Sequence, residues 1–376
     1  MTVERNRVSR LAALGLGAVT AIVVRGVTSL LNDERMRASR PELPDDRSKQ
    51  SDENPAAAAS EPGRGREAET PADVPAPGWK DIGWRTYKEI GRDRVPAVAA
   101  GVTFYVLLAA FPAVAALVSL YGLFADSGTI SEHLADLGSF VPSGAVDIIG
   151  EQIKRLDSKG DGALGFATLL GIATSVWSAN AGVKAIFDAL NVAYGEEEKR
   201  GFVLLNATSL AFTLGAVVFM MAALGAVVVL PLWLEALGLS TVGEWALRIG
   251  RWPALLIAVI GGLAVLYRFG PSRDRARWVW ITPGAALAGL VWVGFSIGFS
   301  WYVSNFGSYN ETYGSLGAAI GFMTWIWLSA TIVLVGAELN AEVEHQTAKD
   351  STEGPEAPLG TRGATVADNV GQAAGS

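Results

Sequence analysis

The chain has 376 residues, of which 50 % are hydrophobic and 18 % are charged, and its formal net charge is −7. The acidic balance does not favour nucleic acid as a partner, and the lack of cysteine excludes disulfides, thiolate nucleophiles and cysteine-based metal sites. The two histidines, His133 and His345, lie about 210 positions apart, so we expect them neither to share a metal ion nor to serve one nucleophile.

The N-terminal third begins with a short apolar stretch, residues 11–24, flanked by arginines. Three interpretations stay open for it: a short helix on or in the membrane surface, an additional span, or a cleaved signal peptide. This stretch defines an N-terminal segment over 1–33. Residues 34–78 are rich in Pro, Ala, Glu, Arg and Ser without periodicity, which predicts a disordered linker.

Residues 79–94 have the spacing of an amphipathic helix, with apolar side chains on one face and most charges on the other. The apolar face consists of Trp79, Ile82, Tyr87 and Ile90. This pattern predicts a helix that lies at the membrane interface before the first span. Two further amphipathic helices, separated by Pro142, are expected in the long connection after the first span, where they would roof the opposite face.

Six apolar stretches within a membrane domain over 79–346 approach the length of about 20 residues needed to cross a bilayer. The expected spans are 96–124, 162–184, 202–234, 252–269, 279–303 and 314–337. The third carries no charge over 33 residues, whereas the second is polar in its C-terminal half. The predicted fold class is all-α: a polytopic membrane protein with a six-helix transmembrane bundle and interfacial amphipathic helices. Residues 347–376 are expected to form a disordered tail.

The distribution of Lys and Arg predicts the orientation of this bundle. Twelve of these residues flank the spans on one side and five on the other. The positive-inside rule then places both ends of the six-span core in the cytoplasm. Within the spans, Pro112 is expected to kink the first helix, and the pairs Gly294/Gly298 and Gly317/Gly321 are expected to let helix backbones approach closely.

The most suggestive polar residues are Asn180, Lys184, Asp188 and Asn191, which fall within roughly 80° of arc on a helix, with Trp177 on the same stripe. Charged residues inside a membrane usually face a bundle interior or a cavity. The stripe therefore predicts a substrate path in which Lys184 attracts an anionic group. The alternative is an interfacial position, in which Lys184 extends towards the headgroups and pairs with Asp188.

Other polar candidates are weaker. Glu338 and Glu342 follow the last span one turn apart, and could form an acid/base pair, although a solvated helix end is the simpler interpretation. Tyr309 and Tyr313 in the last outer loop and Tyr105 in the first span could line the path or anchor the interface. No phosphate-binding loop, HExxH or G-x-S-x-G motif occurs, so no catalytic residue, metal site or cofactor is predicted.

Four stretches of the sequence resemble the YihY / virulence factor BrkB family of bacterial inner-membrane proteins. They are AAGVTFYVLLAAFP (99–112), VWSANAGVKAIFDALNVAYGEEEKRGF (176–202), the long run WVWITPGAALAGLVWVGFSIGFSWYVSNFGSYNETYGSLGAAIGFMTWIWLSA (278–330) and VGAELNAEVE (335–344). The resemblance implies a multi-pass protein of the bacterial cytoplasmic membrane with about six spans. Members of this family have carried the label "ribonuclease BN" and a link to serum resistance. The family brings no assigned catalytic residues.

The residues and the resemblance together favour a transporter or permease for a lipid or a small amphiphilic or anionic molecule. A non-transporting scaffold for envelope assembly or stress resistance is the alternative. A membrane-bound hydrolase or ribonuclease is disfavoured, because phosphodiester hydrolysis usually needs clustered metal ligands and a basic groove. The expected partners are membrane lipids, with a homo-oligomer or other envelope proteins as further candidates, and no nucleic acid.

Overall fold

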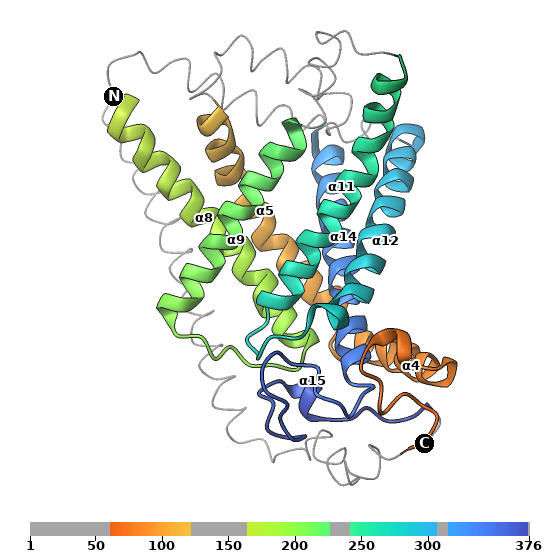
Figure 1. The fold of residues 1–376 in the computed structure, drawn as a ribbon. Helices are drawn as coiled ribbons and strands as arrows, with labels where there is room; N and C mark the ends of the chain where they lie inside the picture. The colour runs from red at the N-terminus through yellow and green to blue at the C-terminus, as the bar shows by residue number, and fades with distance from the viewer. Residues whose placement is uncertain (1–60, 122–163, 226–240, 307–314, 375–376) are drawn as a thin grey trace, which may run out of the picture. The chain divides into compact units, whose positions relative to one another are not determined.

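The computed structural model describes residues 61–121, 164–225, 241–306 and 315–374, all of which belong to one compact unit, Ala56–Ser376 (Figure 1). Every regular element in these ranges is a helix. The β-type pairing found in these ranges is an isolated bridge between Ala276 and Thr352. The predicted all-α fold class is therefore confirmed.

Each of the six expected spans overlaps one long helix. In chain order the elements are η1 (Pro71–Asp73), α4 (Ala76–Arg92), α5 (Val95–Tyr121), α8 (Leu164–Ala193), α9 (Phe202–Leu224), α11 (Thr241–Phe269), α12 (Trp278–Phe306), α14 (Ser315–Glu344) and α15 (Thr365–Asp368). Local chemistry sets several of their boundaries. The α4 helix follows Pro75, α9 follows Gly201, and Gly195 ends α8 in the left-handed region at φ 61°.

Over the described residues, the candidate membrane spans are fewer than the long helices. Four helices in the described ranges are long and apolar enough to cross a membrane, namely α9, α11, α12 and α14. A fifth span results if α4 and the first part of α5 are counted together, although they are bent by 59° at their junction. Arg94 at this junction has a φ of 51°, which a non-glycine residue rarely adopts. Four or five spans are supported, so the predicted count of six is not confirmed.

The α14 helix is the central element of the packing. It contacts α4, α5, α8 and α12, while α5 packs most extensively against α8 (Figure 1). The two remaining long helices are more peripheral, since α9 packs mainly against α8 and α11 mainly against α12. Side-chain hydrogen bonds tie α14 to its neighbours: Trp327 Nε1 donates to the Pro96 carbonyl at 2.8 Å, and the Tyr267 hydroxyl donates to the Val333 carbonyl at 2.7 Å.

The buried apolar core follows α14 and gathers residues from α5, α8, α11 and α12. Its members include Val95, Ala99, Val102, Leu190, Tyr267, Ile281, Ala285, Leu334, Ala337 and Ala341. Alanine is frequent here because small side chains allow helix backbones to pack closely. In contrast, most large apolar side chains of α9 are exposed, with Val203 at 79 % and Val218 at 65 %. This helix therefore presents an apolar surface suited to lipid.

The closest contact between α12 and α14 is made at two glycines. A methyl group on Gly284 would collide with the Gly336 carbonyl oxygen, and one on Gly336 would lie 2.6 Å from the Tyr267 hydroxyl oxygen. Asn340 uses the same contact, since its Oδ1 accepts a hydrogen bond from the Gly284 amide at 2.7 Å. Both positions therefore require glycine for steric reasons.

The glycines singled out from the sequence do not have this role. Among the described residues, a Cβ on Gly294, Gly298 or Gly321 would meet nothing within 4 Å, so the expected close packing is not seen at these three positions. The surroundings of Gly317 lie outside the described residues. Spacing alone identified small residues, but it could not show which of them face another helix. The kink at Pro112 stays a prediction.

The expectation of disorder is wrong for the described parts of both terminal segments. Residues 61–78, assigned to a linker, and residues 347–374, assigned to a tail, pack together at one end of the long helices. We call the assembly of residues 61–94, 270–277 and 345–374 the terminal cap; α4 and α15 mark it in Figure 1. A second apolar cluster joins the cap to the long helices: Ala68, Val74 and Ile82 of the cap pack with Trp280 of α12 and Val343 of α14.

The helix expected before the first span is present as α4, and the side that it packs against the protein carries charged as well as apolar residues. Asp81, Ile82 and Arg85 are buried, whereas Tyr87 is 78 % exposed. The charges lie inwards because partners in the terminal cap neutralise them. Residues 1–33, including the stretch 11–24, the expected roof helices around Pro142, and the last outer loop lie outside the described residues.

Candidate functional site

A line of polar side chains runs between α8 and α9. Lys184 Nζ donates a hydrogen bond to Asn206 Oδ1 at 2.5 Å, and Thr213 Oγ1 donates to Asn180 Oδ1 at 3.3 Å. Ser209 lies between Asn206 and Thr213 on the same face of α9 and is fully buried. We call these five residues the polar seam. It joins two helices whose other surfaces are largely apolar.

Lys184 carries the charge of the polar seam. Asn206 is the fifth residue of α9, so at 1.5 Å per residue the ammonium group lies roughly 6 Å inside the apolar segment. Its partner Asn206 is a neutral amide, and within the described ranges Lys184 forms no ion pair with a carboxylate. The Trp177 ring centroid is 5.8 Å from the ammonium nitrogen, and Trp177 is 55 % exposed. The site therefore offers a half-buried cation beside an exposed aromatic ring.

The predicted stripe is only partly brought together. Asn180 and Lys184 face α9, but Asp188 is exposed and makes no ion pair with Lys184. The alternative pairing at one helical turn is therefore absent. Asn191 lies at the end of α8, where its Oδ1 accepts a hydrogen bond from the Ser272 amide at 2.7 Å. Asn191 thus organises a connection between helices.

The connection after α8 is held by a compact ionic group. Arg200 Nη2 donates to Glu198 Oε2 at 2.7 Å, and Asn191 Nδ2 donates to the same oxygen at 3.2 Å. Burial opposes the ionisation of Glu198, but these hydrogen bonds outweigh it and lower the pKa of the carboxyl from 4.5 to about 2. Glu198 therefore stays ionised and fixes the approach of the chain to α9.

Of the three tyrosine candidates, Tyr105 lies within the described residues. Tyr105 on α5 is 48 % exposed and packs edge-on against Phe104, with ring centroids 5.5 Å apart. Its position suits contact with lipid. Tyr309 and Tyr313 lie outside the described residues.

Glu342 is buried, so the expectation of a solvated helix end is wrong. It forms an ion pair with Arg85 of α4, and both side chains are less than a tenth exposed. His345 Nδ1 lies 3.5 Å from the other Glu342 oxygen, and Arg85 Nη2 also donates to Gln346 Oε1 at 2.7 Å. The Glu342 carboxylate therefore attaches α4 to α14.

Glu338 is also buried, at 1 % exposure, but its environment is different. Its Oε1 atom makes no hydrogen bond within the described part of the chain. The predicted pair of carboxylates is therefore two separate groups: one has a guanidinium partner, and the other has none.

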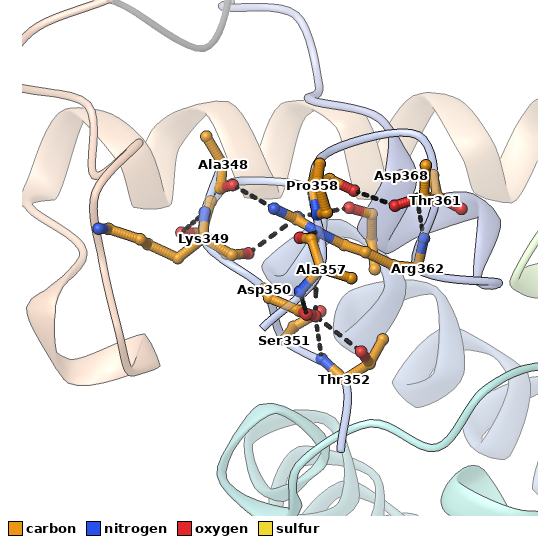
Figure 2. Close-up of polar contacts among 12 residues, drawn as sticks. Ala348, Lys349, Asp350, Ser351, Thr352, Ala357, Pro358, Thr361, Arg362 and Asp368 are labelled. Atoms are coloured by element: carbon orange, nitrogen blue, oxygen red, sulfur yellow. Dashed lines mark hydrogen bonds and ion pairs between the residues drawn. The ribbon is translucent and has the colours of Figure 1, made fainter. Parts of the chain in front are cut away.

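Buried arginines hold the terminal cap together. Arg273 makes two hydrogen bonds to Glu344, at 2.6 and 3.2 Å. Arg362 donates to the carbonyl oxygens of Ala348, Lys349, Ala357 and Ala367, as Figure 2 shows in part. Beside it, burial opposes the ionisation of Asp350, but hydrogen bonds from Ala357 and Thr352 outweigh this and lower the pKa of Asp350. These contacts explain how a polar, glycine-rich segment folds.

The described residues contain no group of three or more His, Asp or Glu side chains that could hold a metal ion. The chemistry offered at the polar seam is instead that of a cation and neutral hydrogen-bonding groups. Such a set can bind an anion or a polar headgroup, and it contains no pair of groups placed for proton transfer to a reacting bond.

Comparison with known proteins identifies the family. The model of the family described as Virulence factor BrkB matches residues 86–360, which is well over half of the chain. The chain belongs to this family. The ribonuclease-like protein YfkH of Bacillus subtilis (strain 168) is 33 % identical over 211 residues, which cover 53 % of the present chain and 72 % of YfkH. The resemblance seen in the sequence is thus confirmed.

Other relatives of this BrkB-family chain are called UPF0761 membrane proteins. The one from Tolumonas auensis is 37 % identical over 82 residues, covering 22 % of this chain and 27 % of its own. The one from Pseudoalteromonas translucida is 34 % identical over 92 residues, covering 24 % and 30 %. The matches thus span less than a third of these two relatives. No solved structure matches the chain. Together with its apolar helices, these relatives identify a membrane protein.

Sequence reasoning missed the α9 half of the polar seam. Asn206, Ser209 and Thr213 recur at spacings of three and four within an otherwise apolar, uncharged stretch, which places them on one helical face. This spacing could have predicted a polar face on the third expected span. Arg85, by contrast, lies 257 positions from Glu342, and no local pattern relates the two.

Proposed function

We propose that this protein is a permease of the bacterial cytoplasmic membrane that binds and moves an anionic lipid or a small anionic amphiphile. The observation that carries the proposal is the Lys184 ammonium group in the polar seam, which is bound to an amide oxygen at 2.5 Å. A charge in a membrane segment is costly unless it is paired. The anionic headgroup of a ligand would supply the missing negative charge.

The surroundings of Lys184 support an amphiphile over a small inorganic anion. Trp177 beside it is 55 % exposed, and the neighbouring α9 exposes Leu214 at 51 % and Val218 at 65 %. An acyl chain could lie along this apolar surface while its headgroup reaches Lys184. The neutral donors and acceptors of the seam would bind the remaining headgroup oxygens. Membrane lipids are therefore the partners that we propose.

Orientation follows from the charge distribution. The terminal cap carries Arg64, Arg66, Arg85, Arg273 and Arg362, among other basic residues. We propose that the cap faces the cytoplasm, in agreement with the positive-inside rule. The polar seam would then lie near the cytoplasmic leaflet, where a newly made anionic lipid could enter it.

The test uses the full chain reconstituted in vesicles that contain a fluorescently labelled phosphatidylglycerol or phosphatidylethanolamine. Movement of the label between leaflets is followed by chemical quenching from outside. Lys184→Gln removes the charge but keeps a hydrogen-bond donor for Asn206, and should slow phosphatidylglycerol movement by about tenfold, equivalent to about 1.4 kcal/mol. Lys80→Gln, at an exposed position of α4, is the matched control and should have no effect.

Wild-type transport by Lys184→Gln, or equal movement of both labelled lipids, would overturn the proposal. Complete absence of movement in the wild-type protein would favour the second candidate, an envelope scaffold. One observation favours that candidate: the terminal cap is a folded platform that an assembly partner or a second copy could use. RNA cleavage by purified protein that is lost with Lys184→Gln would instead support a nuclease.

A further inference from the structure

We propose that Glu338 is a proton-binding site, separate from the polar seam, at the inner end of the terminal cap. The site itself stands on the position of one side chain and does not depend on the proposed transport. The role that we give it, coupling proton movement to transport, rests on the proposed function.

Burial and pairing distinguish Glu338 from its neighbours on α14. It lies within the apolar segment Ala319–Glu344, and is 1 % exposed. Glu342 and Glu344, further along the helix, are equally buried, but each has an arginine partner. Glu338 Oε1 makes no hydrogen bond in the described ranges. Because nearly all buried polar atoms are satisfied, this oxygen needs a ligand or a proton.

The charges that act on Glu338 are themselves acidic. They are Asp93 at the α4–α5 junction, Glu342 on the following turn of α14, and Glu89 of α4. Arg85, the cation on this side, is already paired with Glu342. An ionised Glu338 would therefore be buried among like charges, which is strongly unfavourable. Binding of a cation removes this cost.

A proton satisfies the geometry better than a metal ion. Metal cations of the Na⁺ or Ca²⁺ type need several oxygen ligands, and the described residues contain no group of three acidic or histidine side chains that could supply them. A proton needs one carboxyl group. Once bound, it would make Glu338 neutral and able to donate a hydrogen bond.

Two further buried polar groups accompany Glu338. The Tyr194 hydroxyl and Asn340 Nδ2 are both buried, and neither makes a hydrogen bond of standard geometry within the described residues. Tyr194 interacts electrostatically with Glu338, and its ring lies 5.1 Å from the Arg273 guanidinium in the terminal cap.

The position of Glu338 also suggests how its charge would act on the fold. Asp93 and Arg94 form the bent junction between α4 and α5, and Arg94 has a left-handed backbone, which a non-glycine residue rarely adopts. Loss of the proton would add repulsion between Glu338 and Asp93 at this junction. Since α5 packs extensively against α8, a shift of α5 would reach the helix that carries Lys184.

The first experiment detects the proton directly. Infrared difference spectra of the full chain in lipid are recorded between neutral and alkaline buffers, where exposed carboxyl groups are already ionised. The wild-type protein should lose a protonated carboxyl band on alkalinisation. Glu338→Gln should abolish this change, and Glu197→Gln, at an exposed position, should keep it. A band that is absent, or that persists in Glu338→Gln, would overturn the proton site.

The second experiment tests coupling in the same vesicles used for lipid movement. An imposed pH gradient should change the rate of phosphatidylglycerol movement by about tenfold in wild-type protein and have no effect on Glu338→Gln. Gradient-insensitive movement in the wild type would overturn coupling while leaving the permease proposal intact. A titrating carboxyl band without any lipid movement would support the proton site and refute the permease.

Discussion

Removal of one partner from the Arg273–Glu344 pair should destabilise the protein severely. The two side chains are 2 % and 0 % exposed, and the Ser351 hydroxyl donates a third hydrogen bond to Glu344 at 3.0 Å. Burial opposes the charge on Arg273, but the Glu344 carboxylate outweighs this and raises the pKa of the guanidinium. In Glu344→Gln the arginine keeps its charge and loses its counter-ion. We expect this unpaired buried charge to lower the free energy of unfolding by about 3–5 kcal/mol.

The double variant decides whether this loss comes from the unpaired charge. Arg273→Met and Glu344→Met together remove both charges, so most of the stability should return, less about 1 kcal/mol for the Ser351 hydroxyl left without its acceptor. Unfolding of the detergent-solubilised protein by dodecyl sulfate, followed by circular dichroism, measures this double variant, its two single variants Arg273→Met and Glu344→Met, and Glu344→Gln. The reasoning fails if either single variant stays within about 0.5 kcal/mol of wild type, or if the double variant shows the sum of both losses.

Three further predictions use the same unfolding assay or simple proteolysis. Gly284→Ala and Gly336→Ala should each cost about 1–3 kcal/mol by overpacking, whereas Gly294→Ala, with open space around it, should be neutral; equal effects at all three would contradict the described contact. Because the pKa of Glu198 is lowered on folding, its carboxylate stabilises the protein at pH values above the ordinary pKa of 4.5. This contribution should disappear as the pH falls towards about 2. Glu198→Gln should lack that acid-dependent part of the stability. Arg362→Gln itself removes one trypsin site, so cleavage is followed after Lys349, where it should speed up by roughly tenfold or more. An unchanged cleavage rate there would show that the contacts in Figure 2 do not hold this segment.

The apolar segments were predictable because their length and composition are local properties of the sequence. Asn180 and Lys184 were also found locally, since helical spacing places them on one face. Their partners were not found, because a helical periodicity gives the direction of a side chain and not the identity of the helix that it meets. Asp188 lies on the same arc, yet it remains exposed.

Charged residues were the main source of error. Glu342 follows an apolar run, so it had the appearance of a solvated helix end, but Arg85 reaches it from a segment 257 positions earlier. Residues 347–374 have the composition of a disordered tail, yet their backbone carbonyls accept hydrogen bonds from Arg362. Contacts between residues so far apart in the sequence form only in the folded bundle, so neither helix propensity nor hydropathy can predict them.

The terminal cap has a consequence for biosynthesis. Asp81 near the start of the domain accepts a hydrogen bond from the backbone amide of Ala374 at 2.8 Å, and Arg66 donates to the Gly371 carbonyl at 2.7 Å. Gly371 and Ala374 follow all the long helices of the described ranges in the chain, so they are synthesised after them. These contacts of the terminal cap can therefore form only once the long helices have been made, and a nascent polypeptide stalled before Gly371 would hold Asp81 and Arg66 without those partners.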